Sequence, residues 1–369
     1  MKKEFVVPSI QTVENELINK AFSYTSRGNK FVYHPNEIWN YLNGNGNSII
    51  SAHVAPTNKC NLNCSYCNQS NRSKGKFLEL DIIKEFVTGL MSRGLKAVIV
   101  TGGGEPTIYP KFNELTKWLK EQGLKTALIT NGTNNRTGKE FVDTWDTFTW
   151  IRASLNFFRG KLIPLKIPET LNKGNVGMSL VYQNQTPDML RQVADVADKY
   201  NARYVRIIPD CCKDAEDIIR ERDMLKDMFE RLGYKRFFVQ DKVPSQARLE
   251  TCHQSKLRPF LLPDGKVAPC DCYMLNRDEN NNFYKTLPDI FNLASDTTHP
   301  ISYLEYLDGK RNQGFNPLTS CNGCGFLENN QILENLTILH EKYPNEPIEK
   351  LFERIGQFPD KNVTDREFV

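Results

Sequence analysis

Three cysteines fall within the eight residues Cys60–Cys67 of this 369-residue chain. Their spacing is C-x3-C-x2-C, and Tyr66 lies directly before the last of them. Thiolates are soft ligands that suit iron–sulfur clusters or zinc. Three thiolates cannot saturate a [4Fe–4S] cluster, which has four irons. One iron would stay open to a ligand from outside the protein, so this segment predicts a reactive centre.

Zinc is the alternative for this segment, because C-x2-C pairs are common in structural zinc sites. A structural zinc site needs a fourth ligand close by. The twenty residues after Cys67 contain neither Cys nor His. An iron–sulfur cluster with one open iron is therefore favoured over zinc.

The C-x3-C-x-aromatic-C run resembles the signature of the radical S-adenosylmethionine (SAM) enzymes. The resemblance implies that Cys60, Cys64 and Cys67 hold a [4Fe–4S] cluster whose open iron binds SAM. It also implies that an electron from the cluster cleaves SAM into methionine and a 5′-deoxyadenosyl radical, which removes a hydrogen atom from the substrate. Tyr66 matches the aromatic residue that packs near the adenine.

The composition is that of an ordinary globular protein, with 39% hydrophobic and 25% charged residues. A net charge of +4 is too mild to indicate nucleic acid by itself. The sequence shows neither an apolar run long enough to span a membrane nor a secretory signal, which predicts a cytoplasmic protein. In that compartment the ten cysteines indicate metal or redox use rather than disulfides.

Strand-like and helix-like segments alternate along the chain from residue 48. Such alternation predicts right-handed βαβ units and a parallel sheet, either open or closed into a barrel. The resemblance implies an α/β fold of the partial (β/α)6, TIM-like barrel type, with the active site at the carboxyl ends of the strands. The six predicted strands are 48–54, 97–100, 126–129, 150–155, 178–182 and 204–208.

A glycine-rich segment, Thr101–Thr107, follows the second predicted strand. Glycines there let the backbone approach a ligand closely, although a plain tight turn has the same composition. The segment resembles the family's G-G-E-P motif, which holds the methionine amino group of SAM. The matching residues are Gly103, Gly104 and Glu105, and Glu105 joins the three cysteines in the predicted catalytic set.

Polar residues at the ends of later strands match family positions that contact SAM. Asn131 ends the third strand in a T-N-G-T segment, where Asn-Gly is also a common turn dipeptide. Ser154 and Asn156 end the fourth strand and match contacts to the SAM carboxylate or ribose. Arg206 in the sixth strand is a further candidate for cofactor binding, or else the partner of a core carboxylate.

A second cysteine group lies near the carboxyl end, at Cys252, Cys270, Cys272, Cys321 and Cys324. A hairpin turning at Asp-Gly within 260–267 would bring the first two near each other, and the distant C-x2-C could complete an S4 site. Structural zinc fits this spacing. The pattern also resembles the twitch form of the SPASM modules, which holds one auxiliary [4Fe–4S] cluster. The predicted ligands are Cys252, Cys270, Cys321 and Cys324, with Cys272 as a substitute ligand or a free thiol.

These features divide the chain into four predicted units. They are an N-terminal extension at 1–47, a radical SAM barrel at 48–240, a twitch-like auxiliary cluster module at 241–330 and a helical tail at 331–369. The polar end of that tail, 357–369, is predicted to be mobile. The vicinal pair Cys211 and Cys212 follows the sixth strand and is interpreted as small apolar filling or as a hydrogen-atom donor.

The resemblance thus implies an enzyme that uses SAM and two [4Fe–4S] clusters, with the auxiliary cluster serving electron transfer. A flavodoxin or ferredoxin would supply electrons. A small-molecule or nucleotide-type substrate is favoured, because 47 residues before the barrel are too few for a separate peptide-recognition domain. The alternatives are a peptide-modifying maturase, an enzyme that modifies bases in nucleic acid, and a non-enzymatic iron–sulfur or zinc protein.

Overall fold

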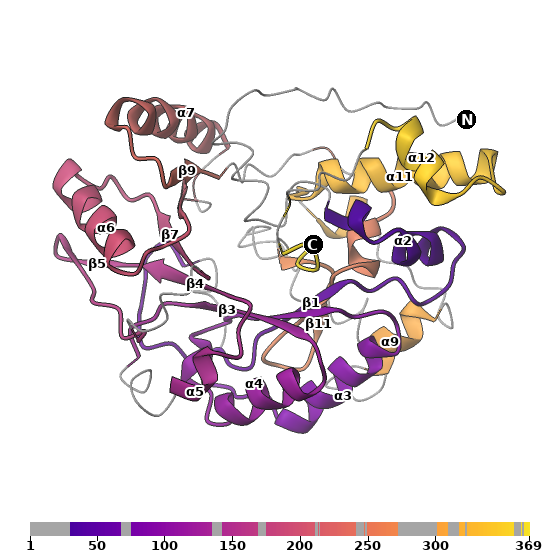
Figure 1. Ribbon diagram of the computed structural model, residues 1–369, viewed down its shortest axis with the longest axis horizontal. Helices are drawn as coiled ribbons and strands as arrows, with labels where there is room; N and C mark the ends of the chain where they lie inside the picture. The colour runs from indigo at the N-terminus through magenta and orange to yellow at the C-terminus, as the bar shows by residue number, and fades with distance from the viewer. Residues whose placement is uncertain are drawn as a thin grey trace.

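A curved sheet dominates the computed structural model of the chain, and helices run along its outer side (Figure 1). The structure describes residues 30–67, 75–134, 142–168, 175–210, 213, 215–240, 247, 249–271, 301–308, 317–321, 323–357, 363 and 365–369. Cys211, Cys212 and Cys272 lie outside the described residues, so their predicted roles stay predictions.

Nine strands form the main sheet, in the order β11-β10-β1-β2-β3-β4-β7-β8-β9. All neighbours pair in parallel except β10 and β11. Their bounds are β1 Ser51–Val54, β2 Ala97–Val100, β3 Lys125–Thr130, β4 Trp150–Leu155, β7 Val176–Val181, β8 Val205–Ile208, β9 Phe237–Val239, β10 Phe260–Leu261 and β11 Val267–Ala268. Within the described residues β9 and β11 are the two edges, so the sheet is an open, partial barrel. The predicted fold class is confirmed.

Helices connect the parallel strands and cover the outer face of the sheet. They are α3 (Leu80–Met91), α4 (Phe112–Glu121), α5 (Val142–Trp145), α6 (Pro187–Lys199) and α7 (Ala215–Leu232). At the start of α6 the Thr186 hydroxyl accepts a hydrogen bond from the Met189 backbone nitrogen (3.3 Å), and Pro187 occupies the first turn. Both features are typical of helix N-termini. The large core lies between these helices and the outward-facing strand residues, such as Val54, Val100 and Leu180.

Side chains alternate along a strand, so the residues next to these outward-facing ones point to the concave side of the sheet. Ile99 and Ala127 on this side form a small cluster with Phe368. Phe368 and Val369 are 3% and 2% exposed, and Lys125 forms an ion pair with Glu367 at 2.7 Å. The prediction of a mobile end is therefore wrong for residues 365–369, which pack across the amino-terminal end of the strands.

A second core joins the two ends of the chain. It includes Phe31 and Ile38, together with Leu336 and Leu351. The first two lie on or next to α2 (Pro35–Leu42), and the others lie on α11 (Leu327–Lys342) and α12 (Ile348–Arg354). The predicted helices after the last cysteine are confirmed (Figure 1). The remaining elements are η1 Lys30–Tyr33, η2 Pro106–Ile108, β5 Phe157–Phe158, β6 Lys161–Leu162, η6 His253–Lys256, α9 Ile301–Leu307 and α10 Pro317–Ser320.

The hairpin predicted at residues 260–267 is present as β10 and β11, which pair antiparallel around a turn with Gly265 at φ +82°. Strand β10 also pairs in parallel with β1, and His53 lies opposite Phe260. The predicted auxiliary module therefore shares the sheet of the barrel. The division into four units itself stays a prediction.

Candidate functional site

The cysteine motif occupies the loop that leaves the carboxyl end of β1. Cys60 is exposed and Cys64 and Cys67 are half-buried, and none of them is in a disulfide. The Cys67 backbone nitrogen donates to the Cys64 carbonyl oxygen at 3.2 Å, which turns the loop back on itself. Burial raises the pKa of the Cys60 thiol, and the charges of Glu105, Cys64 and Cys67 raise it further. The three thiols therefore lie close enough together to influence one another.

The glycine-rich loop after β2 packs directly against the residues that precede Cys60. The Gly104 nitrogen donates to the Thr57 carbonyl oxygen at 2.9 Å, and the Glu105 nitrogen donates to the Lys59 carbonyl oxygen at 2.7 Å. A Cβ atom at Gly104 would lie 1.9 Å from that Lys59 oxygen. Only glycine permits this approach, so the two sequence motifs form one continuous surface.

Glu105 is buried (1% exposed) and links the glycine-rich loop to the end of β3. Its Oε1 accepts hydrogen bonds from the Thr107 nitrogen (3.1 Å), the Thr107 hydroxyl (2.6 Å) and the Thr130 hydroxyl (2.5 Å). Its Oε2 accepts one from the Asn131 nitrogen at 2.7 Å. Burial raises the pKa of Glu105, and these hydrogen bonds oppose the rise. The carboxylate therefore positions the loop, and its predicted contact with SAM stays a prediction.

Asn131 and Asn156 bring the ends of β3 and β4 to the cysteine motif. The Asn131 amide nitrogen lies 3.7 Å from the Cys60 sulfur and donates to the Asn61 side-chain oxygen at 2.8 Å. The Asn156 side-chain oxygen accepts hydrogen bonds from the Tyr66 hydroxyl (2.6 Å) and the Cys64 thiol (3.2 Å). Asn131 is thus more than a turn residue, because its side chain reaches the motif.

Ser154 and Arg206 lie in one row across the concave side of the sheet. Ser154 is opposite Ser179 on β7, and Ser179 is opposite Arg206 on β8. The Asn156 amide donates to the Ser154 carbonyl oxygen at 2.8 Å, so this row lies directly beneath the cysteine motif. Arg206 donates to the Ser179 hydroxyl at 2.9 Å and to the Gln240 side-chain oxygen at 2.7 Å. The suggested pairing of Arg206 with a core carboxylate is wrong among the described residues.

Arg152 and Tyr204 are site residues that the sequence analysis missed. They lie on the same side of the sheet as Arg206, and the Arg152 Nε donates to the Tyr204 hydroxyl at 2.9 Å. The available signal was an arginine two residues before Ser154 within an otherwise apolar strand segment, Trp150–Leu155. Because residues two apart on a strand face the same side, that arginine was bound to face the site.

The four predicted C-terminal ligands line one cavity. Cys252, Cys270, Cys321 and Cys324 are all half-buried there, beside Asn330 of α11. Burial raises the pKa of the Cys252 thiol to about 12. The Asn330 amide donates to the Cys324 sulfur at 3.5 Å, and its oxygen accepts from the Gln254 nitrogen at 2.9 Å. The structure thus brings together cysteines that are up to seventy-two positions apart in the sequence.

Both cysteine groups have the donor chemistry that iron–sulfur clusters require, namely free thiols that converge on one loop or one cavity. Among the described residues, no group of three or more His, Cys, Asp or Glu side chains is gathered closely enough to hold a single metal ion. A tetrahedral zinc site would place its sulfur atoms only about 3.8 Å apart, given Zn–S bonds of about 2.3 Å. No helix within the described ranges is long and apolar enough to cross a membrane.

Comparison with known families identifies the first half of the barrel. Residues 54–158 match the family model described as the Radical SAM superfamily. Over these residues the chain is similar to the radical SAM superfamily. The match begins at the end of β1 and ends within β5, so it contains the cysteine motif, the glycine-rich loop and both asparagines.

Three curated relatives share about a quarter of the chain. The 7-carboxy-7-deazaguanine synthase of Methanothermobacter thermautotrophicus is 38% identical over 24% of this chain and 35% of its own length. A probable GTP 3′,8-cyclase of Methanococcus maripaludis is 32% identical over 24% of this chain and 30% of its own length. The AdoMet-dependent heme synthase of Methanosarcina barkeri is 37% identical over 20% of this chain and 22% of its own length. The chain thus spans about a third or less of the length of these relatives.

Two solved structures are more loosely similar to parts of this chain. SuiB of Streptococcus suis, bound to the precursor peptide SuiA, has a TM-score of 0.48 and 17% identity over 66% of this chain and 64% of that one. The enzyme anSMEcpe, with bound AdoMet and the peptide Cp18Cys, has a TM-score of 0.44 and 13% identity over 83% and 98%.

Proposed function

We propose that this protein is a radical SAM enzyme whose catalytic [4Fe–4S] cluster is held by Cys60, Cys64 and Cys67. When bound, the reduced cluster supplies one electron that cleaves SAM and so provides the 5′-deoxyadenosyl radical for hydrogen-atom abstraction from the substrate. The observation that supports this most strongly is the convergence of three chain segments on the cysteine loop. Asn131 and Asn156 contact the cysteine motif, the glycine-rich loop contacts the residues just before Cys60, and all three lie in the segment that matches the family model.

Several residues of the chain are placed to hold SAM in the proposed complex. Gly103 and Gly104 offer backbone groups beside the cysteine loop, and a Cβ atom at Gly104 would block the approach to Lys59. Glu105 fixes that loop to the end of β3. Among the described residues its Oε2 accepts one hydrogen bond, which leaves it room to accept another from an ammonium group. Asn156 holds the Tyr66 hydroxyl and thereby orients the aromatic ring. Ser154 lies two residues before Asn156 on the same face of β4 and is the proposed further contact to SAM.

The four C-terminal cysteines are proposed to hold an auxiliary [4Fe–4S] cluster. Their lining of one cavity supports this assignment. A cluster with four thiolates has no open iron, so it would serve electron transfer or structure rather than bind substrate. Structural zinc remains the competing occupant, and metal analysis distinguishes the two.

A small-molecule or nucleotide-type substrate is the proposed class. The names of two relatives, a deazaguanine synthase and a probable GTP cyclase, support it. A flavodoxin or ferredoxin is the proposed electron donor. Peptide substrates are the second candidate, and base modification in nucleic acid gains no support from a net charge of +4.

Anaerobic reconstitution with iron and sulfide tests the proposal. The loaded protein is incubated with SAM and dithionite, and 5′-deoxyadenosine is measured by liquid chromatography. About eight irons per chain with deoxyadenosine formed is the expected result. About four irons with activity would assign the C-terminal cysteines to zinc or to no metal. Firmly bound zinc without deoxyadenosine would refute the enzyme proposal.

A further inference from the structure

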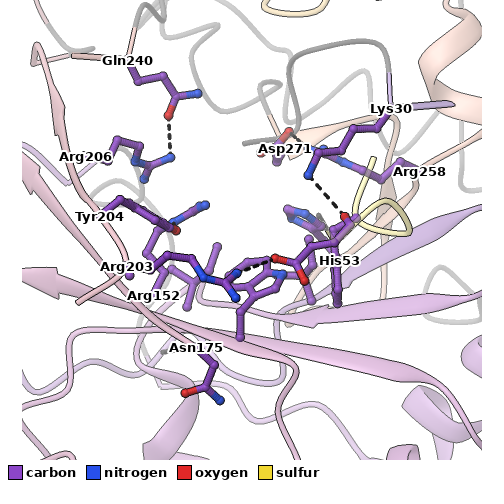
Figure 2. Close-up of a pocket in the computed structure, with 16 residues that line it drawn as sticks. Lys30, His53, Arg152, Asn175, Arg203, Tyr204, Arg206, Gln240, Arg258 and Asp271 are labelled. Atoms are coloured by element: carbon purple, nitrogen blue, oxygen red, sulfur yellow. Dashed lines mark hydrogen bonds and ion pairs between the residues drawn. The ribbon is translucent and has the colours of Figure 1, made fainter. Parts of the chain in front are cut away.

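A cavity lined by basic side chains lies on the concave side of the sheet, between the row of Arg206 and the packed segment 365–369 (Figure 2). It has a free volume of about 100 Å³ and is partly open to solvent. A single water molecule needs only about 10–15 Å³ of such space. The cavity therefore has room for a small anionic group, and the proposed function above assigns it no role.

The sheet register places this cavity beneath the cysteine motif. Arg152 lies two residues before Ser154 and four before Asn156, so the three side chains share one face of β4. Asn156 contacts Cys64, while Arg206 lies in the row of Ser154. Four residues along a strand, from Arg152 to Asn156, correspond to roughly 13 Å. A ligand anchored at the arginines would need about this length to reach the cysteine end.

Arg206 is buried (8% exposed), and within the described part of the chain its hydrogen bonds go to neutral oxygens of Ser179 and Gln240. Burial and the charge of Arg152 lower the pKa of Arg206 well below its usual range. A buried cation without a counter-charge is costly. Such a group becomes stable when an anion enters beside it.

The position of the neighbouring Arg152 depends on a contact that only a glycine at position 177 permits. Its Nε donates to the Tyr204 hydroxyl, and its guanidinium lies over the Trp150 ring, 5.0 Å from the centroid. A Cβ atom at Gly177 would lie 2.2 Å from the Tyr204 ring. Gly177 therefore makes room for the ring that orients Arg152, which indicates a constructed site rather than a chance cation.

The remaining charges around the cavity leave it net positive. Arg203 pairs with Asp365 at 3.0 Å, and Arg258 pairs with Asp271. Lys30 donates to the Asp365 carbonyl oxygen, and burial, together with Arg152 and Arg258, lowers its pKa to about 8. Figure 2 shows Arg258 and Asp271 across the cavity from Arg206. Among the described lining residues, five cations thus face two carboxylates, each of which already has a partner.

We propose that Arg206 and Arg152 bind an anionic group of the substrate, a phosphate or a carboxylate. This inference rests on the proposed function for the reaction above the cavity, and it narrows the substrate to a small organic anion. Guanidinium groups suit both anions because their donors match two oxygens at once. Arg206, predicted from the sequence to contact SAM, is reassigned to the substrate.

The test is calorimetric titration of the full chain, loaded with iron and sulfide, at constant ionic strength. The probes are inorganic phosphate, pyrophosphate and malonate, with sodium chloride as the blank. Saturable binding of at least one probe is expected, and Arg206→Gln or Arg152→Gln should weaken it at least about ten-fold, the worth of one charge-assisted hydrogen bond. Arg191→Gln on the surface of α6 should bind as wild type. Preference for phosphates or for malonate identifies the anion.

Two results would overturn the proposal: wild-type protein that binds none of the probes saturably, or undiminished binding in both glutamine variants. If those variants do not fold, Tyr204→Phe replaces them, because it removes the hydrogen bond from Arg152 Nε to the Tyr204 hydroxyl without removing a charge. Binding should then weaken several-fold, and unchanged binding would count against the site. Wild-type protein that binds an anion but forms no deoxyadenosine would refute the proposed function alone.

Discussion

The two cysteine groups of this protein are built in opposite ways. Cys60, Cys64 and Cys67 lie within one exposed loop, and polar side chains from β3 and β4 reach their sulfur atoms. Cys252, Cys270, Cys321 and Cys324 come from distant segments and line a mostly apolar cavity. Under the proposed function, the first group would hold its cluster through three thiolates and leave one iron open, whereas the four thiolates of the second would complete theirs. The same thiol chemistry would then serve reaction in one place and storage or transfer of electrons in the other.

The largest contrast is expected between Cys64→Ala and Cys324→Ala. Loss of Cys64 should abolish deoxyadenosine formation, because two thiolates do not hold the catalytic cluster. Loss of Cys324 should lower the iron content but leave SAM cleavage measurable. Iron analysis and the deoxyadenosine assay on both reconstituted variants check this. Equal loss of cleavage in the two variants would remove the functional distinction between the groups.

Thiol reactivity should separate the two groups in metal-free protein. The thiolate is the reactive form, and a thiol with a pKa of about 12 is only about 0.01% ionised at pH 8. Alkylation of Cys252 at pH 8 should therefore be slower than that of exposed Cys60. Because deprotonation limits the reaction, the Cys252 rate should rise about ten-fold per pH unit. Mass spectrometry of alkylated peptides measures both rates, and similar rates at pH 8 would contradict the structure.

Glu105→Ala should destabilise the first site specifically. The change leaves the Thr130 hydroxyl and the Asn131 nitrogen without their acceptor, at a cost of about 2–4 kcal/mol in the free energy of unfolding. Urea denaturation measures it. The matched control is Glu114→Ala, whose carboxylate is 58% exposed beside Lys84 and should change stability by about 0.5 kcal/mol or less. A cost below about 1 kcal/mol for Glu105→Ala would show that the two loops are not coupled through it.

Tyr66→Phe should have the smallest effect. The change removes the hydroxyl that donates a hydrogen bond to the Asn156 side-chain oxygen at 2.6 Å, but it keeps the aromatic ring. The expected loss in the free energy of SAM binding is about 1 kcal/mol, which raises the dissociation constant for SAM roughly five-fold. Equilibrium dialysis with labelled SAM checks it, and Tyr343→Phe on the opposite core is the control. A loss of SAM affinity above 100-fold would mean that the Tyr66 hydroxyl itself contacts the cofactor.

Much of the fold followed from local patterns. Short apolar segments such as Ala97–Val100 and the Asp-Gly turn before Lys266 predict their structures because the determining residues are neighbours in sequence. Strand β9 was missed because three residues, Phe237–Val239, show no period. The pairing of β10 with β1 was also missed, since backbone hydrogen bonds between distant segments leave no local signal.

The site shows the same division. The cysteines and the glycine-rich loop were identified because their spacing resembles short motifs of the radical SAM family. Arg152 was overlooked although its position two residues before Ser154 determined its direction. The burial of Phe368 could not be predicted, because it depends on Ile99 and Ala127, more than two hundred residues away. Composition alone made the end of the chain look mobile.

Electron paramagnetic resonance of two reduced variants tests the central contrast most directly. One variant, Cys252→Ala with Cys321→Ala, retains only the first cysteine group, and the other, Cys60→Ala with Cys64→Ala, retains only the second. Addition of SAM should shift the g values of the cluster in the first variant and leave those of the second unchanged. A shift in the second variant, or none in the first, would contradict the assignment of Cys60, Cys64 and Cys67 as the open, SAM-binding site.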